Sequence, residues 1–422
     1  MRSPPGAIDR KDQGVNVKQA VHERAAGATP TQAELVARAQ ALVPMLRERA
    51  AATEANRRIS DEVARTLIDA GFFNIVMPAE AGGYAMRHSA LWEVARQIGR
   101  GCASTGWILG LIGISPWIVG LFTQRAQKEV FGSGNPIVPV MTGGVGRGLQ
   151  VTQTGDEYEV SGTWHYGTGI DLCEWAIVMA PLASADPAGR PDARLFILPK
   201  HEFDIDHTSW NVLGMRGTGS KNVQLNRARV PGHRSISWTA AQAGEFPGAA
   251  ISDNPMYQMP LNAVFAMSVV APIVGAASGA VDHAVSLLRG RFRQGTSREQ
   301  KGESFSQIEI GQSAATVEMA FALLMSDADE MYETVAAGRP FSIEERARYR
   351  AHCSLISRTV LQAVDRLAGL AGGSLIQSGS AIERSFRDLH AMTTHFLMQP
   401  DVTGEVYGRA LLGLELPENA RI

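Results

Sequence analysis

The chain has 422 residues, 45% of them hydrophobic and 19% charged, which excludes a mostly disordered protein and is enough for about two to four domains. Forty Lys and Arg against 42 Asp and Glu give a net charge of −2, so no positive excess supports nucleic acid as the main partner. The cysteines Cys102, Cys173 and Cys353 are too far apart in sequence to support a disulfide framework or a CxxC metal site, which fits a reducing cytoplasm.

The N-terminal third is predicted to be helical after a flexible tail over residues 1–30. That tail mixes Arg, Lys, Asp, Gly and Pro and has no apolar segment typical of a signal peptide. In residues 31–134 apolar side chains recur at helical spacing, and Ser60, Asp61 and Glu62 are typical of a helix start. These residues are expected to form an N-terminal helical domain.

An uncharged segment between Arg100 and Arg125 is long enough to span a membrane. Pro116 stands in its middle, several glycines interrupt it, and no second convincing span accompanies it. We therefore expect a buried helical hairpin here and no membrane association.

Residues 135–240 are predicted to form a central β-domain. Short β-rich runs separated by Gly, Pro and Asp occupy residues 137–143, 149–155, 158–164, 175–182, 194–200 and 223–231. Their spacing is typical of a small β-barrel or sandwich, and no helices alternate with them, so a parallel Rossmann sheet is not expected.

Residues 241–422 are predicted to form a C-terminal helical bundle. The expected helices cover residues 256–289, 305–337, 343–370, 379–397 and 402–412. Small residues such as those in VVAPIVGAASGAV permit close packing within a bundle or across a subunit interface.

Common catalytic motifs are absent from the sequence. The glycines of residues 143–148 do not fit GxGxxG and lie between strands, while residues 217–221 lack the order of a phosphate loop. His201 and His207 do not form a zinc motif, and no GxSxG elbow is present.

Four motifs follow one another along the chain. In chain order they are CASTGW at residues 102–107, GTWHYGTG at residues 162–169 with Trp175 after it, WNVLGMRGTGS at residues 210–220, and the stretch 384–408. Together with the helical, β, helical domain order, they resemble the acyl-CoA dehydrogenase superfamily over residues 31–413. The resemblance is strongest to its oxygenase branch, the group D two-component flavin-dependent monooxygenases. It implies an α+β, mainly α fold of the acyl-CoA dehydrogenase type.

The resemblance implies a flavin site on the β-domain. Alternate residues of a strand face the same way, so Trp164, Tyr166 and Thr168 are expected to present an aromatic wall and a hydroxyl together, with Thr168 near flavin N5. The alternative interpretation is that these residues are part of a β-barrel core.

A second group of candidate cofactor-binding residues follows in the WNVLGMRGTGS motif. Arg216, Gly217, Thr218 and Ser220 offer a cation, a flexible backbone and two hydroxyls for a flavin phosphate or ribityl chain, or form an ordinary turn. In the superfamily an arginine after the long first helix of the bundle reaches the flavin of a neighbouring subunit. Arg291 and Arg293 are equal candidates for it here, and a solvated helix end is the alternative.

One chemical point separates dehydrogenases from oxygenases. An acyl-CoA dehydrogenase needs a carboxylate base, which many members carry seven to nine residues after an Arg-Asp pair. Here the pair is Arg387-Asp388, and that place holds His395. No acid follows until Asp401, and the alternative early position has only Asp253 before it.

The oxygenase interpretation therefore predicts two catalytic residues. A C4a-hydroperoxyflavin survives where water is excluded and N5 keeps its proton, for which Thr168 supplies a hydroxyl. His395, expected on a helix, holds or donates a proton at the peroxide. His390 lies on a different helical face and is not an equal candidate.

The predicted substrate pocket contains Trp107, Ser115 and His88. Phenol-hydroxylating relatives often carry a histidine that binds the phenolate where this sequence has Ser115, so an indole, another heterocycle or a polycyclic ring stays open beside a phenol. Trp117 and Phe122 suggest further apolar wall or ordinary core.

We therefore expect the oxygenase component of a two-component monooxygenase that hydroxylates an aromatic substrate. It would use O2 and reduced FMN or FAD (FMNH2 or FADH2), and no metal. A separate NAD(P)H-dependent flavin reductase would be its partner, and it would be a cytoplasmic homotetramer. The alternatives are an acyl-CoA dehydrogenase with a relocated base and a non-catalytic flavin- or acyl-binding protein.

Overall fold

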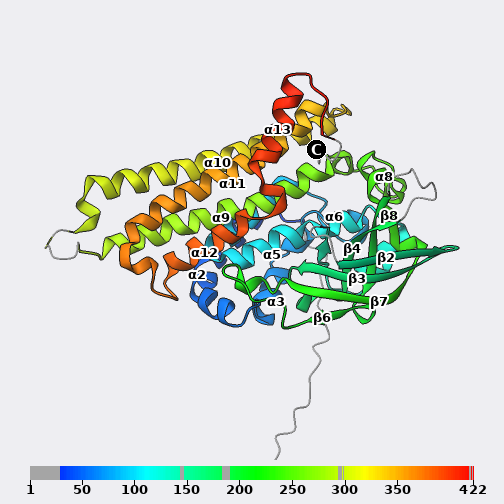
Figure 1. Ribbon diagram of the computed structural model, residues 1–422, viewed down its shortest axis with the longest axis horizontal. Helices are drawn as coiled ribbons and strands as arrows, with labels where there is room; N and C mark the ends of the chain where they lie inside the picture. Colours follow the sequence, from blue (N-terminus) through cyan, green and yellow to red (C-terminus); the bar gives the residue numbers. More distant parts are fainter. Residues whose placement is uncertain are drawn as a thin grey trace, which may run out of the picture.

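The computed structural model has a helical N-terminal region, a β-domain beside it and a long helical bundle (Figure 1). It describes residues 29–142, 147–182, 191–292, 297, 299–417, 420 and 422. Most of the predicted tail, the glycines at 143–146 and Arg293 lie outside the described residues.

Several of the N-terminal helices begin at polar residues that cap them. Thr31 and Glu34 form a reciprocal capping box at the first helix, and the Ser60 side chain accepts the Val63 N–H at the second, which confirms the predicted start. The helices are α2 (Gln32–Ala55), α3 (Asp61–Asp69), α4 (His88–Gly101), α5 (Ala103–Gly113), α6 (Ser115–Val119) and α7 (Gln124–Phe131).

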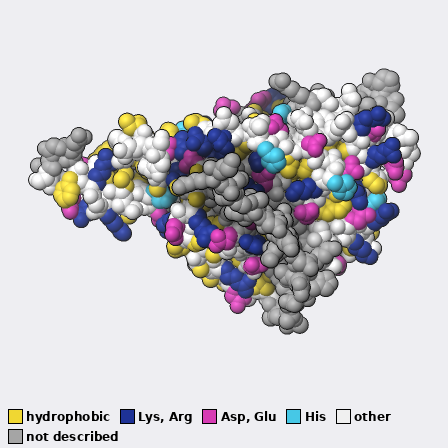
Figure 2. All heavy atoms as spheres, turned by 90° about the horizontal axis from the view of Figure 1, so that it is seen from below, with side chains coloured by type: hydrophobic (Ala, Val, Ile, Leu, Met, Phe, Trp, Pro, Cys, Tyr) yellow, Lys and Arg dark blue, Asp and Glu magenta, His cyan; other side chains and the backbone are white. Residues whose placement is uncertain are grey.

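The uncharged segment forms α5 and α6, both buried within the protein as expected. Among the described residues, two other helices could cross a membrane by length and composition alone, α9 (Leu261–Arg289) and α10 (Ser304–Ala336). Most of the apolar part of α9 is buried inside the fold. The face in Figure 2 carries Lys and Arg interspersed with Asp and Glu, without a large patch of one sign.

The described residues of the β-domain form two four-stranded sheets with orders β1-β4-β5-β8 and β2-β3-β7-β6. Their strands are β1 (Val140–Met141), β2 (Arg147–Thr154), β3 (Glu157–Gly167), β4 (Trp175–Leu182), β5 (Asp192–Pro199), β6 (Asp204–Asp206), β7 (Lys221–Pro231) and β8 (Ser235–Ser237). Sequence reasoning missed β6 and β8, because three residues are too few to show an alternating pattern. It also overestimated β1, which has only two residues.

The C-terminal bundle is built around α9, which packs against α4, α5, α10, α11 and α12. Its helices, with the short α8 before them, are α8 (Trp238–Gln242), α9 (Leu261–Arg289), α10 (Ser304–Ala336), α11 (Ile343–Ala371), α12 (Ala381–Thr393) and α13 (Pro400–Leu411). The small residues allow close approach: a Cβ added at Gly275 would lie 2.2 Å from the Arg96 carbonyl oxygen of α4. The predicted helix over 379–397 is wrong at its end, since α12 stops at Thr393.

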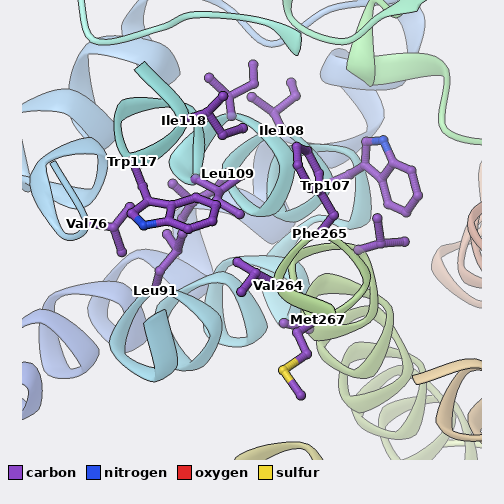
Figure 3. Packing of buried hydrophobic residues seen from close by; sticks show 14 of the residues in the cluster. Val76, Leu91, Trp107, Ile108, Leu109, Trp117, Ile118, Val264, Phe265 and Met267 are labelled. Atoms are coloured by element: carbon purple, nitrogen blue, oxygen red, sulfur yellow. The ribbon is translucent and has the colours of Figure 1, made fainter. Parts of the chain in front are cut away.

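One continuous hydrophobic core joins the three regions. Figure 3 shows Trp107 and Trp117 pointing to different sides, with Ile108 and Leu109 between them in this view. Trp117 and Phe122 are fully buried core residues. The core therefore fixes α5 between the bundle and the β-domain, and α5 positions the candidate site.

Candidate flavin and substrate site

Two loops of the β-domain bring three hydroxyl groups together. Thr168 follows β3, while Thr218 and Ser220 precede β7, and all three are buried. Thr168 Oγ1 lies 2.9 Å from Ser220 Oγ, which lies 2.7 Å from Thr218 Oγ1. The Gly169 N–H donates to the Thr218 carbonyl at 3.1 Å, so the backbone also joins the two loops. The structure therefore unites Thr168, Thr218 and Ser220, as their assignment to one cofactor site requires.

The expected aromatic wall is only partly present. Trp164 is buried and donates its indole N–H to the Met179 carbonyl between the sheets, whereas Tyr166 is 63% exposed. Tyr166 has φ of +64°, and the pairing of β3 with β7 shifts between Trp164 and Gly167. The expectation that Trp164, Tyr166 and Thr168 share a face is therefore wrong, because the strand irregularity breaks the alternation.

Sequence reasoning missed the aromatic partner of Tyr166. Trp210 lies edge-on to it with ring centroids 6.4 Å apart, and the Trp210 indole N–H donates to the Arg216 carbonyl at 3.0 Å. The signal was present, since Trp210 opens the WNVLGMRGTGS motif. Tyr166, two residues before Thr168 in the chain, and Trp210 together form a partly exposed aromatic pair.

An ion pair joins the loop after β3 to the start of β7. Lys221 Nζ lies 2.7 and 2.6 Å from the carboxylate oxygens of Asp171 and 3.1 Å from His207 Nδ1. Lys221 directly follows Ser220, and Asp171 lies three residues after Thr168. Both side chains of the pair are nearly buried, so the contact holds the loops in register.

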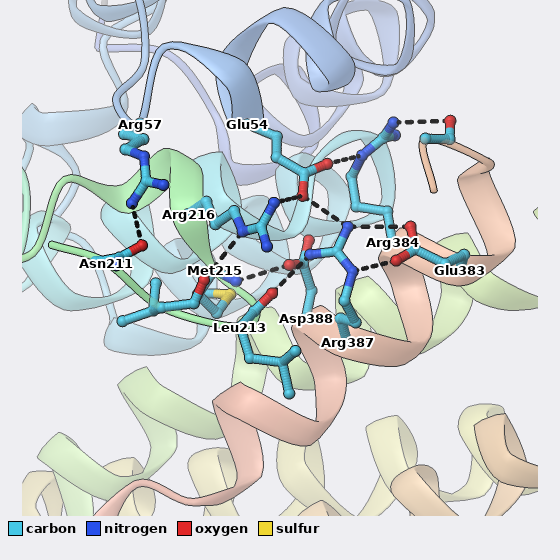
Figure 4. Close-up of polar contacts among 12 residues, drawn as sticks. Glu54, Arg57, Asn211, Leu213, Met215, Arg216, Glu383, Arg384, Arg387 and Asp388 are labelled. Carbon is cyan, nitrogen blue, oxygen red and sulfur yellow. Dashed lines mark hydrogen bonds and ion pairs between the residues drawn. The ribbon is translucent and has the colours of Figure 1, made fainter. Parts of the chain in front are cut away.

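Arg216 faces another part of the protein. Its Nη1 lies 3.5 Å from Glu54 of α2, and its Nε donates to the Val212 carbonyl. Glu54 also contacts Arg384 and Arg387 of α12 at 2.9 and 2.6 Å (Figure 4). These cations hold the pKa of Glu54 below its usual value against the opposing effect of burial. The structure therefore shows Arg216 in an ionic contact between domains, and its expected place beside a flavin phosphate stays a prediction.

Gly217 is also a packing position. A Cβ there would lie 2.5 Å from Cγ2 of Thr53 and 3.0 Å from Cβ of Ser104, so α2 and α5 press directly on this loop. The missing side chain of Gly217 permits close approach to these helices, while the Ser220 hydroxyl beside it contacts both Thr168 and Thr218.

Arg291 holds a helix end. Its Nη1 donates to the Ala371 carbonyl at 2.6 Å, at the C-terminus of α11. Within the described protomer it contacts none of the β-domain hydroxyls, so its expected role toward a neighbouring subunit's flavin stays a prediction.

His395 lies against Trp107 of α5, with ring centroids 5.6 Å apart. It is not on a helix: α12 ends at Thr393, and His395 caps a short 3-10 turn by accepting the Leu397 N–H at its Nδ1. Burial, together with a smaller contribution from the charge of Arg350, lowers the pKa of His395 to about 4. The ring is therefore neutral near pH 7 and carries its hydrogen on Nε2 as a donor.

The predicted pocket residues divide into two groups. Trp107 lies at His395, whereas His88 and Ser115 are completely buried near Trp117. The His88 ring lies 4.8 Å from that of Trp117, and burial lowers the pKa of His88 to about 3. Neither His88 nitrogen nor Ser115 Oγ has a hydrogen-bond partner among the described residues. Neutral polar groups beside Trp117 are thus available to a ligand or to water.

Asp388 connects the bundle to the loop at residues 210–220, which precedes β7. It accepts the Met215 N–H at 2.7 Å, and burial raises its pKa to about 6 even though that hydrogen bond and Arg387 oppose the rise. The Arg-Asp pair was recognised in the sequence, but this contact across 173 residues was not.

We expect Asp388→Asn to change how stability depends on pH. The pKa of Asp388 is higher in the folded protein than in the unfolded chain. Its stabilising contribution to folding is therefore present below about pH 4 and is lost as pH rises through about 6. Asn keeps the acceptor for Met215 but has no charge to bury. The free energy of unfolding, measured with urea at pH 4 and pH 8, is the readout. Relative to wild type, that of the variant should rise by up to about 3 kcal/mol from pH 4 to pH 8. An unchanged difference would contradict a raised pKa.

α5 contacts both parts of the site. A Cβ at Gly169, next to Thr168, would lie 2.6 Å from Ile112 Cδ1 and 3.7 Å from Ile108 Cγ2, while Trp107 contacts His395. The Thr168 loop and His395 thus lie against the same apolar helix between the β-domain and the bundle. A hydroxyl, an aromatic surface, a neutral histidine and apolar walls suit a flat ring with polar edges.

The fold and this site define a flavoprotein of the acyl-CoA dehydrogenase type. Residues 29–133 match the acyl-CoA dehydrogenase N-terminal domain and residues 267–400 match the acyl-CoA dehydrogenase C-terminal domain. The chain belongs to the oxygenase subunits of flavin-dependent monooxygenases within this superfamily, as its similarity to whole proteins of that group shows.

Three comparisons carry that assignment. The chain is 32% identical to the flavin-dependent monooxygenase oxygenase subunit HsaA of Rhodococcus jostii, over 90% of this chain and 99% of that protein. It is 29% identical to the FADH(2)-dependent resorcinol hydroxylase oxygenase component of a Rhizobium species, over 92% and 96%. The crystal structure of 3-HSA hydroxylase from Rhodococcus sp. RHA1 superposes with a TM-score of 0.85 at 31% identity, covering 91% and 98%. The predicted fold and enzyme class are confirmed.

Proposed function

We propose that this oxygenase subunit binds reduced flavin against Tyr166 and Thr168 and hydroxylates a neutral aromatic ring beside His395. The observation that carries the proposal is that α5 contacts both the Thr168 loop and His395. One apolar helix thereby joins a hydroxyl suited to a flavin edge with a histidine suited to the reacting oxygen.

Each side chain has a defined task in this proposal. Bound reduced flavin supplies the electrons that activate O2. Thr168 accepts the hydrogen bond from flavin N5–H, His395 donates from Nε2 to the oxygen that gains charge, and Trp107 helps to exclude water. Because His395 is neutral, it donates a hydrogen bond without placing a buried positive charge.

We propose a phenol or another neutral hydroxylated aromatic as the substrate class. The resorcinol hydroxylase among the relatives acts on such a ring, and its name specifies FADH2, which makes FAD the first flavin to test. His88 and Ser115 carry unpartnered neutral polar atoms, which suit a hydroxyl or carbonyl group rather than an ion. A separate flavin reductase would supply the reduced flavin.

The dehydrogenase alternative has no base in the site. Asp253 precedes the early position of the base and Asp401 follows the late one. Both are exposed at the surface. Asp388 is buried, but the Met215 N–H occupies one of its oxygens. The described residues therefore offer no free carboxylate beside Thr168 or His395 for abstraction of an α-proton.

We further propose a cytoplasmic homotetramer assembled through the bundle. Large apolar side chains are exposed on its long helices, including Phe305, Ile308 and Met319 of α10 and Leu355 of α11. A second copy of the chain would cover this surface from water.

The function is tested with purified protein, a flavin reductase, NADH, FAD or FMN, and a panel of phenols and indoles. Hydroxylated product that requires substrate, O2 and flavin is the expected result. Bleaching of stoichiometrically bound FAD by an acyl-CoA, without any hydroxylated product, would contradict the proposal and favour a dehydrogenase.

A further inference from the structure

The hydroxyls of Thr168, Ser220 and Thr218 form a chain of hydrogen bonds that ends on a backbone carbonyl. Thr168 contacts Ser220, Ser220 contacts Thr218, and Thr218 Oγ1 lies 3.0 Å from the Met215 carbonyl oxygen. Thr168 is the most exposed of the three hydroxyl residues, at 9%. Bulk water therefore does not compete strongly for these hydrogen bonds.

The hydrogen positions in this chain follow from counting donors. A carbonyl only accepts, so Thr218 donates its single hydroxyl hydrogen to Met215. The Ser220–Thr218 contact must then use the hydrogen of Ser220, and the Thr168–Ser220 contact must use that of Thr168. All three hydrogen bonds form together only if each hydroxyl donates toward the Met215 carbonyl. Thr168 keeps free lone pairs and has no hydrogen left to donate elsewhere.

We infer that Thr218 and Ser220 are positioning residues that hold Thr168 as a hydrogen-bond acceptor and thereby make the site prefer reduced over oxidised flavin. This inference rests on the proposed place of Thr168 at flavin N5. Reduced flavin carries a hydrogen on N5, which an acceptor binds well. Oxidised flavin has a lone pair there, which an acceptor opposes.

The two loops are held firmly enough to preserve this direction. The Gly169 N–H donates to the Thr218 carbonyl, and Lys221 binds both oxygens of Asp171. For Thr168 to donate to oxidised flavin, it would have to give up its hydrogen bond to Ser220. One neutral hydrogen bond corresponds to about a three- to tenfold change in affinity.

Thr218→Val tests the inference, because Thr218 contacts Ser220 and Met215 rather than the proposed flavin position. Without the Thr218 oxygen, Ser220 is free to donate to Thr168, and the hydrogen of Thr168 is free for oxidised N5. Oxidised flavin should then bind about three- to tenfold more tightly, with reduced flavin nearly unchanged. The two-electron midpoint potential of bound flavin should fall by about 14 to 30 mV. Anaerobic titration and potentiometry measure both, independently of turnover.

Further variants identify what a negative result means. Thr218→Ser keeps the hydroxyl and should keep the wild-type preference, so a change there would assign the effect to packing and overturn the inference. Thr53→Val removes a buried hydroxyl from the helix that presses on the same loop and should also keep the preference.

Thr168→Val separates the inference from the proposed function. If it alters the preference while Thr218→Val does not, the hydroxyl chain has no role but Thr168 still lies at N5. If neither variant alters the preference, the proposed flavin position itself is wrong. Ser220→Ala should act like Thr218→Val, and the double variant should add little, since both interrupt one chain.

Discussion

His395→Ala is expected to lose hydroxylated product by roughly 10²-fold or more, the usual scale for a positioned acid–base group. Flavin oxidation should continue and release H2O2 in place of product, since Thr168 and its loops do not depend on the imidazole. The ratio of product to H2O2 under steady reductase supply measures this directly. His395→Asn retains a donor and should recover part of the yield.

The pH dependence gives this prediction a second readout. The pKa of His395 is lowered to about 4, so the ring stays neutral at pH 5 to 9 and its hydrogen-bonding state does not change there. Between about pH 6.5 and 4 the unfolded chain binds the proton more readily, so His395 makes stability rise with pH in that window. Product yield limited by His395 should be level above pH 5.

His390→Ala is the matched control. His390 lies on α12 near the surface and pairs with Asp365 at 2.9 Å, away from Trp107. Its loss should change yield little. If His395→Ala keeps the wild-type rate and yield, His395 only packs against Trp107 and has no part in the mechanism. The fold assignment would still stand.

Local patterns predicted much of the fold. The run at residues 175–182 matches β4 at both ends, and the helix start at Ser60 follows from its side chain. The error at Tyr166 arose because period-two alternation assumes a regular strand, and a positive φ interrupts it. His395 was placed on a helix because the sequence around Thr393 has no strong stop signal such as Gly or Pro until Pro400.

The candidate site was predictable in its residue types but not in its contacts. Thr168 and Ser220 were both assigned to the cofactor, yet their hydrogen bond spans 52 positions and needs the pairing of β3 with β7. Arg216 was assigned to a phosphate because its motif is polar. Its partner Glu54 lies in another domain, and nothing local in the sequence connects them.

Gly214→Ala is expected to destabilise the contact between the loop at residues 210–220 and α12. A Cβ there would lie 2.2 Å from the Arg387 carbonyl oxygen and 2.6 Å from its carbon, both backbone atoms that cannot rotate away. Either the loop or α12 must move, which would weaken the neighbouring hydrogen bond between Met215 and Asp388. Overpacking of this kind costs about 1–3 kcal/mol and occasionally more.

Gly404→Ala, in α13, is the control because nothing lies within 4 Å of its added Cβ. Ala has the higher helix propensity, so this variant should gain up to about 1 kcal/mol and bind flavin normally. Gly214→Ala should instead lower the unfolding midpoint and release more H2O2, because Thr218 and Ser220 lie in the displaced loop. Equal midpoints for the two variants would mean that the loop and α12 do not pack as closely as their geometry requires.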